Sequence, residues 1–193
     1  MKYKGINHLA LATRDISMTV RFWRDLLGMR LVAALGKPGY RQYFFEVSAD
    51  DLVAFFEWPD VEPIEEKDAG RVAKGPFAFD HVAIGVEDDD ALWAMKEKLE
   101  ANGIWVSEVI DNGFIHSIFT FDPNGISLEF SCFVKNIDIR LDPIIADKIP
   151  PEVTKEGPDA QAEKWKEAAR TTPPSERKIY PGEMKLYVPL TQG

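Results

Sequence analysis

Cysteine is nearly absent from this chain of 193 residues: Cys132 is the only one, so no disulfide can form within the chain. Proteins without disulfides are typical of a reducing compartment, and we expect a cytoplasmic protein. Long apolar runs are also missing, since none approaches the roughly 18 residues that a membrane-spanning helix requires. The N-terminal residues lead into a strand-like pattern without the apolar segment of a secretory signal. We therefore expect neither a secretory leader nor a membrane partner.

Positive charge is in the minority, with 23 Lys and Arg against 32 Asp and Glu, which gives a formal net charge of −9. Binding to nucleic acid or to an anionic membrane requires clustered basic residues that neutralise phosphates, and the sequence contains no such cluster. Hydrophobic residues make up 45% of the chain and aromatic residues 11%, which is enough for a proper core. We expect a globular protein that binds a small-molecule substrate and no nucleic acid.

The clearest pattern in the chain is an internal repeat. In each half, a strand-like segment is followed by a helix that ends at a glycine, Gly28 in the first half and Gly103 in the second. Three further strand-like segments follow, separated by turn compositions such as Asp122-Pro123-Asn124-Gly125. Both halves therefore predict the order β-α-β-β-β, and we place the first module at residues 1–58 and the second at residues 77–134.

The spacing of apolar residues predicts the bounds of these elements. In the first module we expect a helix at residues 16–27 and strands at residues 5–13, 30–35, 41–47 and 52–58. In the second module we expect a helix at residues 90–101 and strands at residues 79–86, 104–110, 115–121 and 126–133.

Two segments fall outside the repeat. Residues 59–76 are charged and contain Pro and Gly, a composition typical of a linker. Residues 135–193 form a C-terminal extension rich in proline and charge, in which we expect one short helix at residues 158–170. Two interpretations of the extension are open: a partly disordered or surface-wrapping tail, and a lid or dimer arm that covers its aromatic residues.

Two histidines stand at the same place in the two modules, and each is followed at nearly the same distance by a glutamate. His8 precedes Glu57 by 49 residues, and His81 precedes Glu129 by 48 residues. A duplicated unit would bring these two imidazoles and two carboxylates into equivalent positions. Taken singly, each residue has an ordinary alternative role as a hydrogen-bonded or solvated side chain. Together they predict a metal site that uses three or more of the four.

Strand periodicity favours a cavity beside both histidines. Alternate residues share one face of a strand, so His8 lies with Ala10 and Ala12, and His81 likewise lies among small residues. Small side chains beside a polar group leave room for a ligand, whereas a packed core would require bulk there.

The two glutamates differ in their surroundings. Glu129 alternates with serines, so its side of the strand is polar. Glu57 shares its face with Val53 and Phe55, where a carboxylate requires a cation or a proton. His116, the third histidine, has no counterpart in the first module, and we expect it to be hydrogen-bonded or at the surface.

The repeat, together with the segments Phe22-Trp23-Arg24-Asp25-Leu26-Leu27-Gly28-Met29 and Asp122-Pro123-Asn124-Gly125-Ile126-Ser127-Leu128-Glu129, resembles the vicinal oxygen chelate superfamily. That superfamily includes glyoxalase I, extradiol dioxygenases, methylmalonyl-CoA epimerase, and fosfomycin and bleomycin resistance proteins. The resemblance covers residues 4–133. It implies an α+β fold in which two tandem βαβββ modules form a cupped mixed sheet around a divalent metal, and it implies a homodimer. The ligands it implies are His8, His81 and Glu129, with Glu57 as a further candidate.

Imidazole and carboxylate donors without thiolate favour Zn, Ni, Co, Mn or Fe(II). Two histidines and one carboxylate with open positions are typical of non-haem Fe(II) oxygenases. A fourth protein ligand favours Lewis-acid chemistry on a carbonyl, in which a glutamate moves a proton. Glu57 and Glu129 are the candidate catalytic bases in that chemistry.

Departures from two well-known subfamilies narrow the function. Phe119 stands where extradiol dioxygenases carry an active-site tyrosine, and Ile110-Asp111-Asn112 stands where they carry an acid–base histidine. Bacterial glyoxalase I has an arginine and an asparagine as glutathione contacts where this chain has Ala12 and Val61. The leading interpretation is a metal-dependent lyase, isomerase or epimerase that acts on a small metabolite with vicinal oxygens and is not linked to glutathione. An Fe(II) extradiol-type dioxygenase and a non-catalytic ligand-binding or resistance protein of the same fold are the alternatives.

Overall fold

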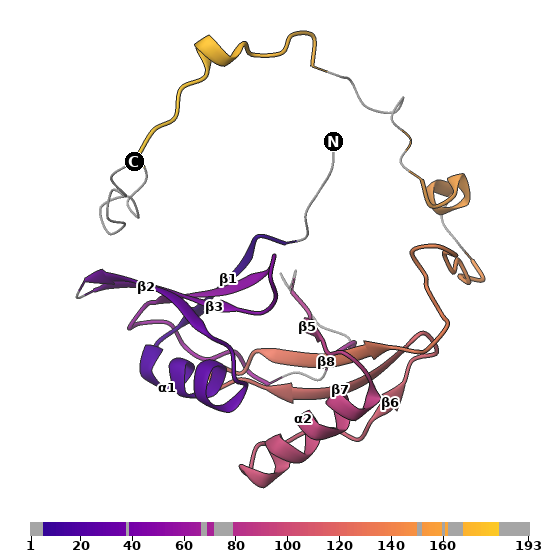
Figure 1. Cartoon of the computed structure of the whole chain (residues 1–193), viewed down its shortest axis with the longest axis horizontal. Coiled ribbons are helices and arrows are strands. Elements are labelled where there is room, and N and C mark those ends of the chain that lie inside the picture. Colours follow the sequence, from indigo (N-terminus) through magenta and orange to yellow (C-terminus); the bar gives the residue numbers. More distant parts are fainter. Residues whose placement is uncertain are drawn as a thin grey trace.

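The computed structural model describes residues 6–37, 39–66, 69–71, 79–149, 152–159, 161 and 168–181. It contains two four-stranded sheets, each with a helix against one face (Figure 1). The strand order is β1-β4-β3-β2 in the first sheet and β5-β8-β7-β6 in the second. The pairs β1–β4 and β5–β8 are parallel, whereas the other neighbours are antiparallel. The α+β fold with two modules of one topology, expected from the repeat, is therefore confirmed.

The first module follows the expected order. Its elements are β1 (His8–Thr13), α1 (Ile16–Val20) with its π-helical continuation η1 (Arg21–Leu26), β2 (Leu31–Lys37), β3 (Tyr40–Glu46) and β4 (Leu52–Glu57). Asp15 starts α1, because its carboxylate accepts hydrogen bonds from two backbone amides of the first turn. Gly28 follows the end of the helix with a φ of 83°, a left-handed conformation that favours glycine.

The second module contains β5 (Val82–Gly85), α2 (Asp89–Ala101), β6 (Ile110–Asp111), β7 (Ile115–Phe121) and β8 (Ser127–Phe133). The strand expected at residues 104–110 is reduced to β6 and an isolated bridge between Val106 and Thr120. A side chain interrupts the ladder there, since the hydroxyl of Ser107 accepts the backbone amide of Phe119 at 2.9 Å.

Aromatic rings build the core of the first module and join it to the second. The side chains of Trp23, Phe45 and Phe55 are fully buried, with ring centroids 5.3–6.5 Å apart. The indole N–H of Trp23 donates to the carboxylate of Asp122, in the turn between β7 and β8, at 3.2 Å. Asp122 also accepts two backbone amides of its own turn. This contact fixes the first helix against the second sheet.

The segment between the modules also lies against that turn. The backbone amide of Ile64 donates to the carbonyl of Asn124 at 2.9 Å. A Cβ atom on Gly125 would lie 2.0 Å from the carbonyl oxygen of Ile64, and the φ of Gly125 is 77°. Only glycine fits this position, which explains the Pro-Asn-Gly turn in physical terms.

Beyond the end of β8, the described parts of the C-terminal extension run away from both sheets (Figure 1). Its described helices are the short 3-10 turns η2 (Glu152–Glu156) and η4 (Pro174–Glu176). The helix expected at residues 158–170 falls largely outside the described residues. Among the described helices, none is long and apolar enough to cross a membrane.

Candidate metal centre

Each sheet has one face covered by its helix, and the opposite face carries the predicted site residues except Glu57. In the second sheet, Ala83 of β5, Glu129 of β8 and Phe119 of β7 are register partners, so they share a face. His81 precedes Ala83 by two residues and has the same orientation along the chain. The neighbours in the alternate positions, such as Phe130, belong to the core beneath α2.

His81 and Glu129 form the central contact on this face. Nε2 of His81 lies 2.8 Å from Oε2 of Glu129. The hydroxyl of Ser117 donates to the other carboxylate oxygen, Oε1, at 2.5 Å. Glu129 and Ser117 are buried, whereas 29% of the His81 side chain is exposed. The carboxylate is therefore held on both oxygens, and solvent reaches the pair through the imidazole.

In both modules, the residue before the histidine holds its Nδ1 atom. Oδ1 of Asn7 lies 2.8 Å from Nδ1 of His8, and Oδ1 of Asp80 lies 2.7 Å from Nδ1 of His81. Because both oxygens are acceptors, each Nδ1 can donate a hydrogen bond to the preceding residue. On His81, Nε2 faces the carboxylate of Glu129. Partners of this kind orient metal-binding histidines and select their tautomer.

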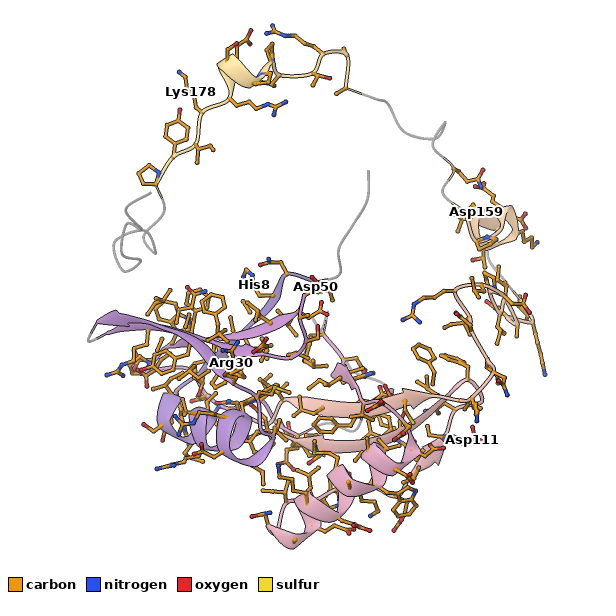
Figure 2. The ribbon with its side chains drawn as sticks, in the orientation of Figure 1. His8, Arg30, Asp50, Asp111, Asp159 and Lys178 are labelled. Carbon is orange, nitrogen blue, oxygen red and sulfur yellow. The ribbon has the colours of Figure 1, made fainter. Side chains whose placement is uncertain are left out.

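The surroundings of the two histidines repeat as well. The imidazole of His8 meets the ring of Phe44 edge-on with centroids 5.6 Å apart, and His81 meets Phe119 in the same way at 6.1 Å. Each phenylalanine lies on the middle antiparallel strand of its sheet. His8 projects from the first sheet on the side away from α1 (Figure 2). The two histidines thus occupy equivalent positions, as the repeat predicted.

The two glutamates are not equivalent. Phe119 pairs with Glu129 in the second sheet, and its counterpart Phe44 pairs with Ala54 in the first. In the first module, the position that corresponds to Glu129 is therefore occupied by Ala54, three residues before Glu57. The expected equivalence of the two glutamates is wrong, because the turns and the register of the first module differ from those of the second.

Glu57 lies on the face that α1 covers. It pairs with Arg41 on the neighbouring strand and accepts the backbone amide of Ile16, at the start of α1, at 3.1 Å. The carboxylate therefore meets the cation that its apolar neighbours require. In the register of β1 and β4, Glu57 stands opposite Thr13, at the other end of β1 from His8. This position directs Glu57 toward the helix.

His116 lies on the other face of the second sheet. It alternates along β7 with Ser117, which faces Glu129, and it points toward α2. Its Nδ1 atom lies 2.6 Å from Oδ1 of Asp89, and this hydrogen bond raises the pKa of His116. The third histidine is thus hydrogen-bonded, as expected, and the sheet separates it from His81.

A cavity of about 470 Å³ opens on the same face as Glu129. Its walls include Trp105, which stacks on Phe121 with ring centroids 5.5 Å apart, and Phe119 beside His81. Ser127 also lines the cavity, and its hydroxyl oxygen is buried with no hydrogen-bond partner among the described residues. Gln42 lies on the face of the first sheet that carries His8, and its buried amide oxygen also has no hydrogen-bond partner among the described residues. Such atoms are rare in folded proteins, where an ordered water, an ion or a ligand satisfies them.

Imidazole nitrogens and a buried carboxylate are ligands of Zn, Mn, Fe, Co and Ni. Among the described residues the structure brings His81 and Glu129 together, whereas His8 does not join them in a group of three donor atoms within 4.8 Å of one another. Three supporting residues escaped sequence reasoning: Asn7, Asp80 and Ser117. The repeated Asn-His and Asp-His dipeptides were the signal for the first two, whereas Ser117 is found only from the strand register.

Comparisons with known proteins identify the family of the chain. The model of the Glyoxalase/Bleomycin resistance protein/Dioxygenase superfamily matches residues 5–130. The chain is 28% identical to the lactoylglutathione lyase of Haemophilus influenzae over 134 residues, which cover 65% of this chain and 90% of that relative. It is 24% identical to the iron-dependent extradiol dioxygenase of Rhodococcus jostii over 152 residues, covering 70% of this chain but only 45% of that relative.

A solved structure shows the same fold. The glyoxylase/bleomycin resistance protein/dioxygenase domain from Frankia sp. EAN1pec matches with a TM-score of 0.58 at 17% identity, covering 70% of this chain and 96% of that one. The family match spans both sheets and includes His8, His81 and Glu129. The chain belongs to the Glyoxalase/Bleomycin resistance protein/Dioxygenase superfamily.

Proposed function

We propose that this protein is a divalent-metal-dependent enzyme that acts on a small metabolite with vicinal oxygens by lyase, isomerase or epimerase chemistry, without glutathione. The proposed metal ligands are Nε2 of His8, Nε2 of His81 and the carboxylate of Glu129. The observation that supports this most directly is the repeated arrangement around the two histidines. In each module an acceptor on the preceding residue holds Nδ1, so Nε2 is the ring nitrogen left to serve as a ligand, and on His81 it already faces Glu129.

A divalent metal at these residues would supply Lewis acidity toward two adjacent substrate oxygens. Asp80 holds the ring of His81, and the hydroxyl of Ser117 holds one carboxylate oxygen of Glu129 in place. We propose Glu129 as the base, which accepts a proton from a substrate carbon and returns it to the neighbouring carbon. Glu57, the other candidate, faces α1 and is engaged by Arg41.

The cavity on the face that carries Glu129 suggests the kind of substrate. Trp105, Phe119 and Phe121 offer aromatic walls, which suit a planar or apolar part of a small molecule. The unpartnered hydroxyl of Ser127 offers a hydrogen bond to a substrate oxygen. A compound that joins vicinal oxygens to such an apolar part fits both features.

One observation favours a second candidate function, an Fe(II) extradiol-type dioxygenase. Because Ala54 replaces a fourth carboxylate, the ligand set reduces to two histidines and one glutamate, the arrangement of non-haem Fe(II) oxygenases. Similarity to an iron-dependent extradiol dioxygenase supports this reading. Phe119 weighs against it, because the ring beside His81 has no hydroxyl that could act as an acid or base.

The first experiment is metal analysis of untagged protein purified without chelator. We expect one equivalent per chain to be lost in His81→Ala and in Glu129→Ala, and to be retained in Glu57→Gln. Loss in Glu57→Gln would make Glu57 a fourth ligand. If no metal binds to the parent protein, even after each ion is added back, the catalytic proposal fails and a ligand-binding protein remains.

Two assays then separate the reactions. The lyase or isomerase proposal predicts deuterium exchange at the carbon beside the carbonyl of an α-hydroxycarbonyl compound in D₂O, lost in Glu129→Ala. The dioxygenase predicts oxygen uptake with catechols after anaerobic loading with Fe(II). Oxygen uptake without exchange would reverse the order of the two candidates.

A homodimer is part of the proposal, and mixing variants tests how the site is assembled. If His8 reaches the His81–Glu129 pair of a second copy, refolding a mixture of His8→Ala and His81→Ala chains restores some intact sites. If each chain holds its own site, the mixture binds no more metal than the separate variants.

A further inference from the structure

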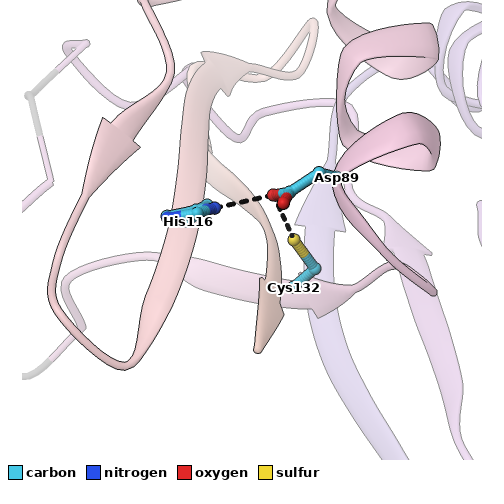
Figure 3. A group of neighbouring side chains, drawn as sticks. All are labelled: Asp89, His116 and Cys132. Atoms are coloured by element: carbon cyan, nitrogen blue, oxygen red, sulfur yellow. Dashed lines mark hydrogen bonds and ion pairs between the residues drawn. The ribbon is translucent and has the colours of Figure 1, made fainter. Parts of the chain in front are cut away.

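A second group of possible ligands lies on the opposite face of the second sheet. His116 of β7 and Cys132 of β8 are register partners, so their side chains project together toward α2. Both point to Asp89 in the first turn of that helix (Figure 3). Nδ1 of His116 lies 2.6 Å from Oδ1 of Asp89, and the thiol of Cys132 donates to the same oxygen at 3.3 Å.

Capping of the helix does not account for Asp89. The N-cap of α2 is Asp88, whose carboxylate accepts the backbone amide of Ala91 at 2.9 Å. The carboxylate of Asp89 turns instead to the sheet and accepts only side-chain donors among its described hydrogen bonds. An acidic group is thus aimed at an imidazole and a thiol, which are both metal ligands.

The remaining nitrogen of His116 also has a carboxylate nearby. Oδ1 of Asp111 lies 3.8 Å from Nε2 of His116. A proton on Nε2 would face Asp111, and Nδ1 would then be free to coordinate, as in metal sites where a carboxylate orients the histidine. With Asp88 and Asp111 beside Asp89, acidic groups outnumber the single imidazole around the cluster.

The cluster is accessible and of suitable size. Asp89 has 60% of its side chain exposed and His116 has 27%, while Cys132 is buried. The three ligand atoms lie within 4.8 Å of one another. Bond lengths of about 2.0–2.3 Å place tetrahedral ligand atoms roughly 3–4 Å apart. Nδ1 of His116 and Oδ1 of Asp89 are closer than this, so the exposed Asp89 side chain would move outward to admit an ion.

Redox or nucleophilic chemistry does not suit Cys132. Burial, aided by the hydrogen bond to Asp89, raises the pKa of this thiol to about 11, so without a metal it stays protonated near neutral pH. A thiolate is the reactive form of cysteine. A bound metal cation would convert the thiol to a thiolate, because coordination displaces the thiol proton.

We propose that Asp89, His116 and Cys132 form a second metal site that takes a transition-metal ion of the Zn(II) or Co(II) type. On binding, the Cys132 thiol releases its proton to solvent, and the imidazole coordinates through Nδ1 with its proton on Nε2. The sulfur donor separates this site from the His81–Glu129 centre, which has only nitrogen and oxygen donors. The fourth position faces solvent and takes water.

Cobalt spectroscopy tests the proposal, because Cys132 is the only cysteine and any thiolate–Co(II) charge-transfer band must come from it. We expect metal-free, reduced protein titrated with Co(II) to develop this near-ultraviolet band at one equivalent. His81→Ala should retain the band, and Cys132→Ser should lose it. His116→Asn is the matched variant, because its amide can still donate to Asp89 but is a poor ligand.

A second readout covers variants that fold poorly. An ion that binds only the folded state raises the melting temperature, so Zn(II) should stabilise His81→Ala but stabilise the double variant His81→Ala, His116→Asn far less. Parent protein with no thiolate band at saturating Co(II) would overturn the proposal and leave the cluster as a hydrogen-bond network that anchors α2. That result would leave the His81–Glu129 centre untouched, since its own test uses separate variants.

Discussion

Ser117 offers the sharpest test of the proposed metal centre. Its buried hydroxyl donates to Oε1 of Glu129 at 2.5 Å, while Oε2 faces His81. Ser117→Ala removes a hydrogen bond to a charged group, worth about 1.5–3 kcal/mol. Loss of such a supporting contact lowers metal affinity by roughly 10–100-fold, which corresponds to about 1.4–2.7 kcal/mol. The two estimates agree, so we expect a loss of affinity in that range.

The assay is a competition titration of Zn(II) or Mn(II) against a chromophoric chelator near pH 7. Ser131→Ala is the matched control, because Ser131 pairs with Ser117 in the register and shares its face. Urea unfolding of the metal-free proteins separates loss of affinity from loss of stability. If Ser117→Ala binds metal as tightly as Ser131→Ala, Glu129 is not a ligand positioned by this hydroxyl, and the proposed centre is refuted.

Three further predictions concern stability. Glu57→Gln should lower the free energy of unfolding by about 2 kcal/mol, because it weakens a half-buried ion pair and a helix contact. Urea unfolding measures this change, and an unchanged midpoint would contradict a stabilising role for the Glu57 contacts. Trp23→Phe removes the indole donor to buried Asp122 and should cost about 2 kcal/mol, or roughly 4–8 °C in melting temperature for a chain of this size; a smaller shift by calorimetry would show that this contact between the modules is weak. Burial raises the pKa of Asp122, so the folded state binds this proton more tightly than the unfolded state does. The free energy of unfolding should therefore fall as the pH rises from below about 4 through the raised pKa and then level off, a trend that urea unfolding of Asp122→Asn from pH 3.5 to about 7 should lack.

Much of the fold could be predicted because its signals are local. Apolar spacing located the helices and most strands. Gly28 and Gly103 marked the helix ends, because glycine adopts a positive φ more readily than other residues do. The strand expected at residues 104–110 was overestimated, because the hydroxyl of Ser107 replaces a backbone partner there. A side-chain hydrogen bond of this kind leaves no periodic trace in the sequence.

The site was predictable only where the two modules match in register. His8 begins β1 and His81 directly precedes β5, so the repeat identified both histidines. Counting residues failed for Glu57, since a separation of 49 or 48 residues ignores differences in turn length. Its alternation with Val53 and Phe55 was the better guide, because it placed the carboxylate on the core face where the structure has it.

In the proposed metal centre, Ala54 limits the number of protein ligands, and a substitution there would change that number. The duplication provides a vacant counterpart of Glu129, on the strand beside Phe44 and on the face that carries His8. A carboxylate introduced there would occupy a fourth corner and remove one position from substrate oxygens or O₂. The number of oxygen atoms that the metal can bind would then depend on one residue of a buried strand. A substitution at this residue would change the reactivity without altering the substrate cavity.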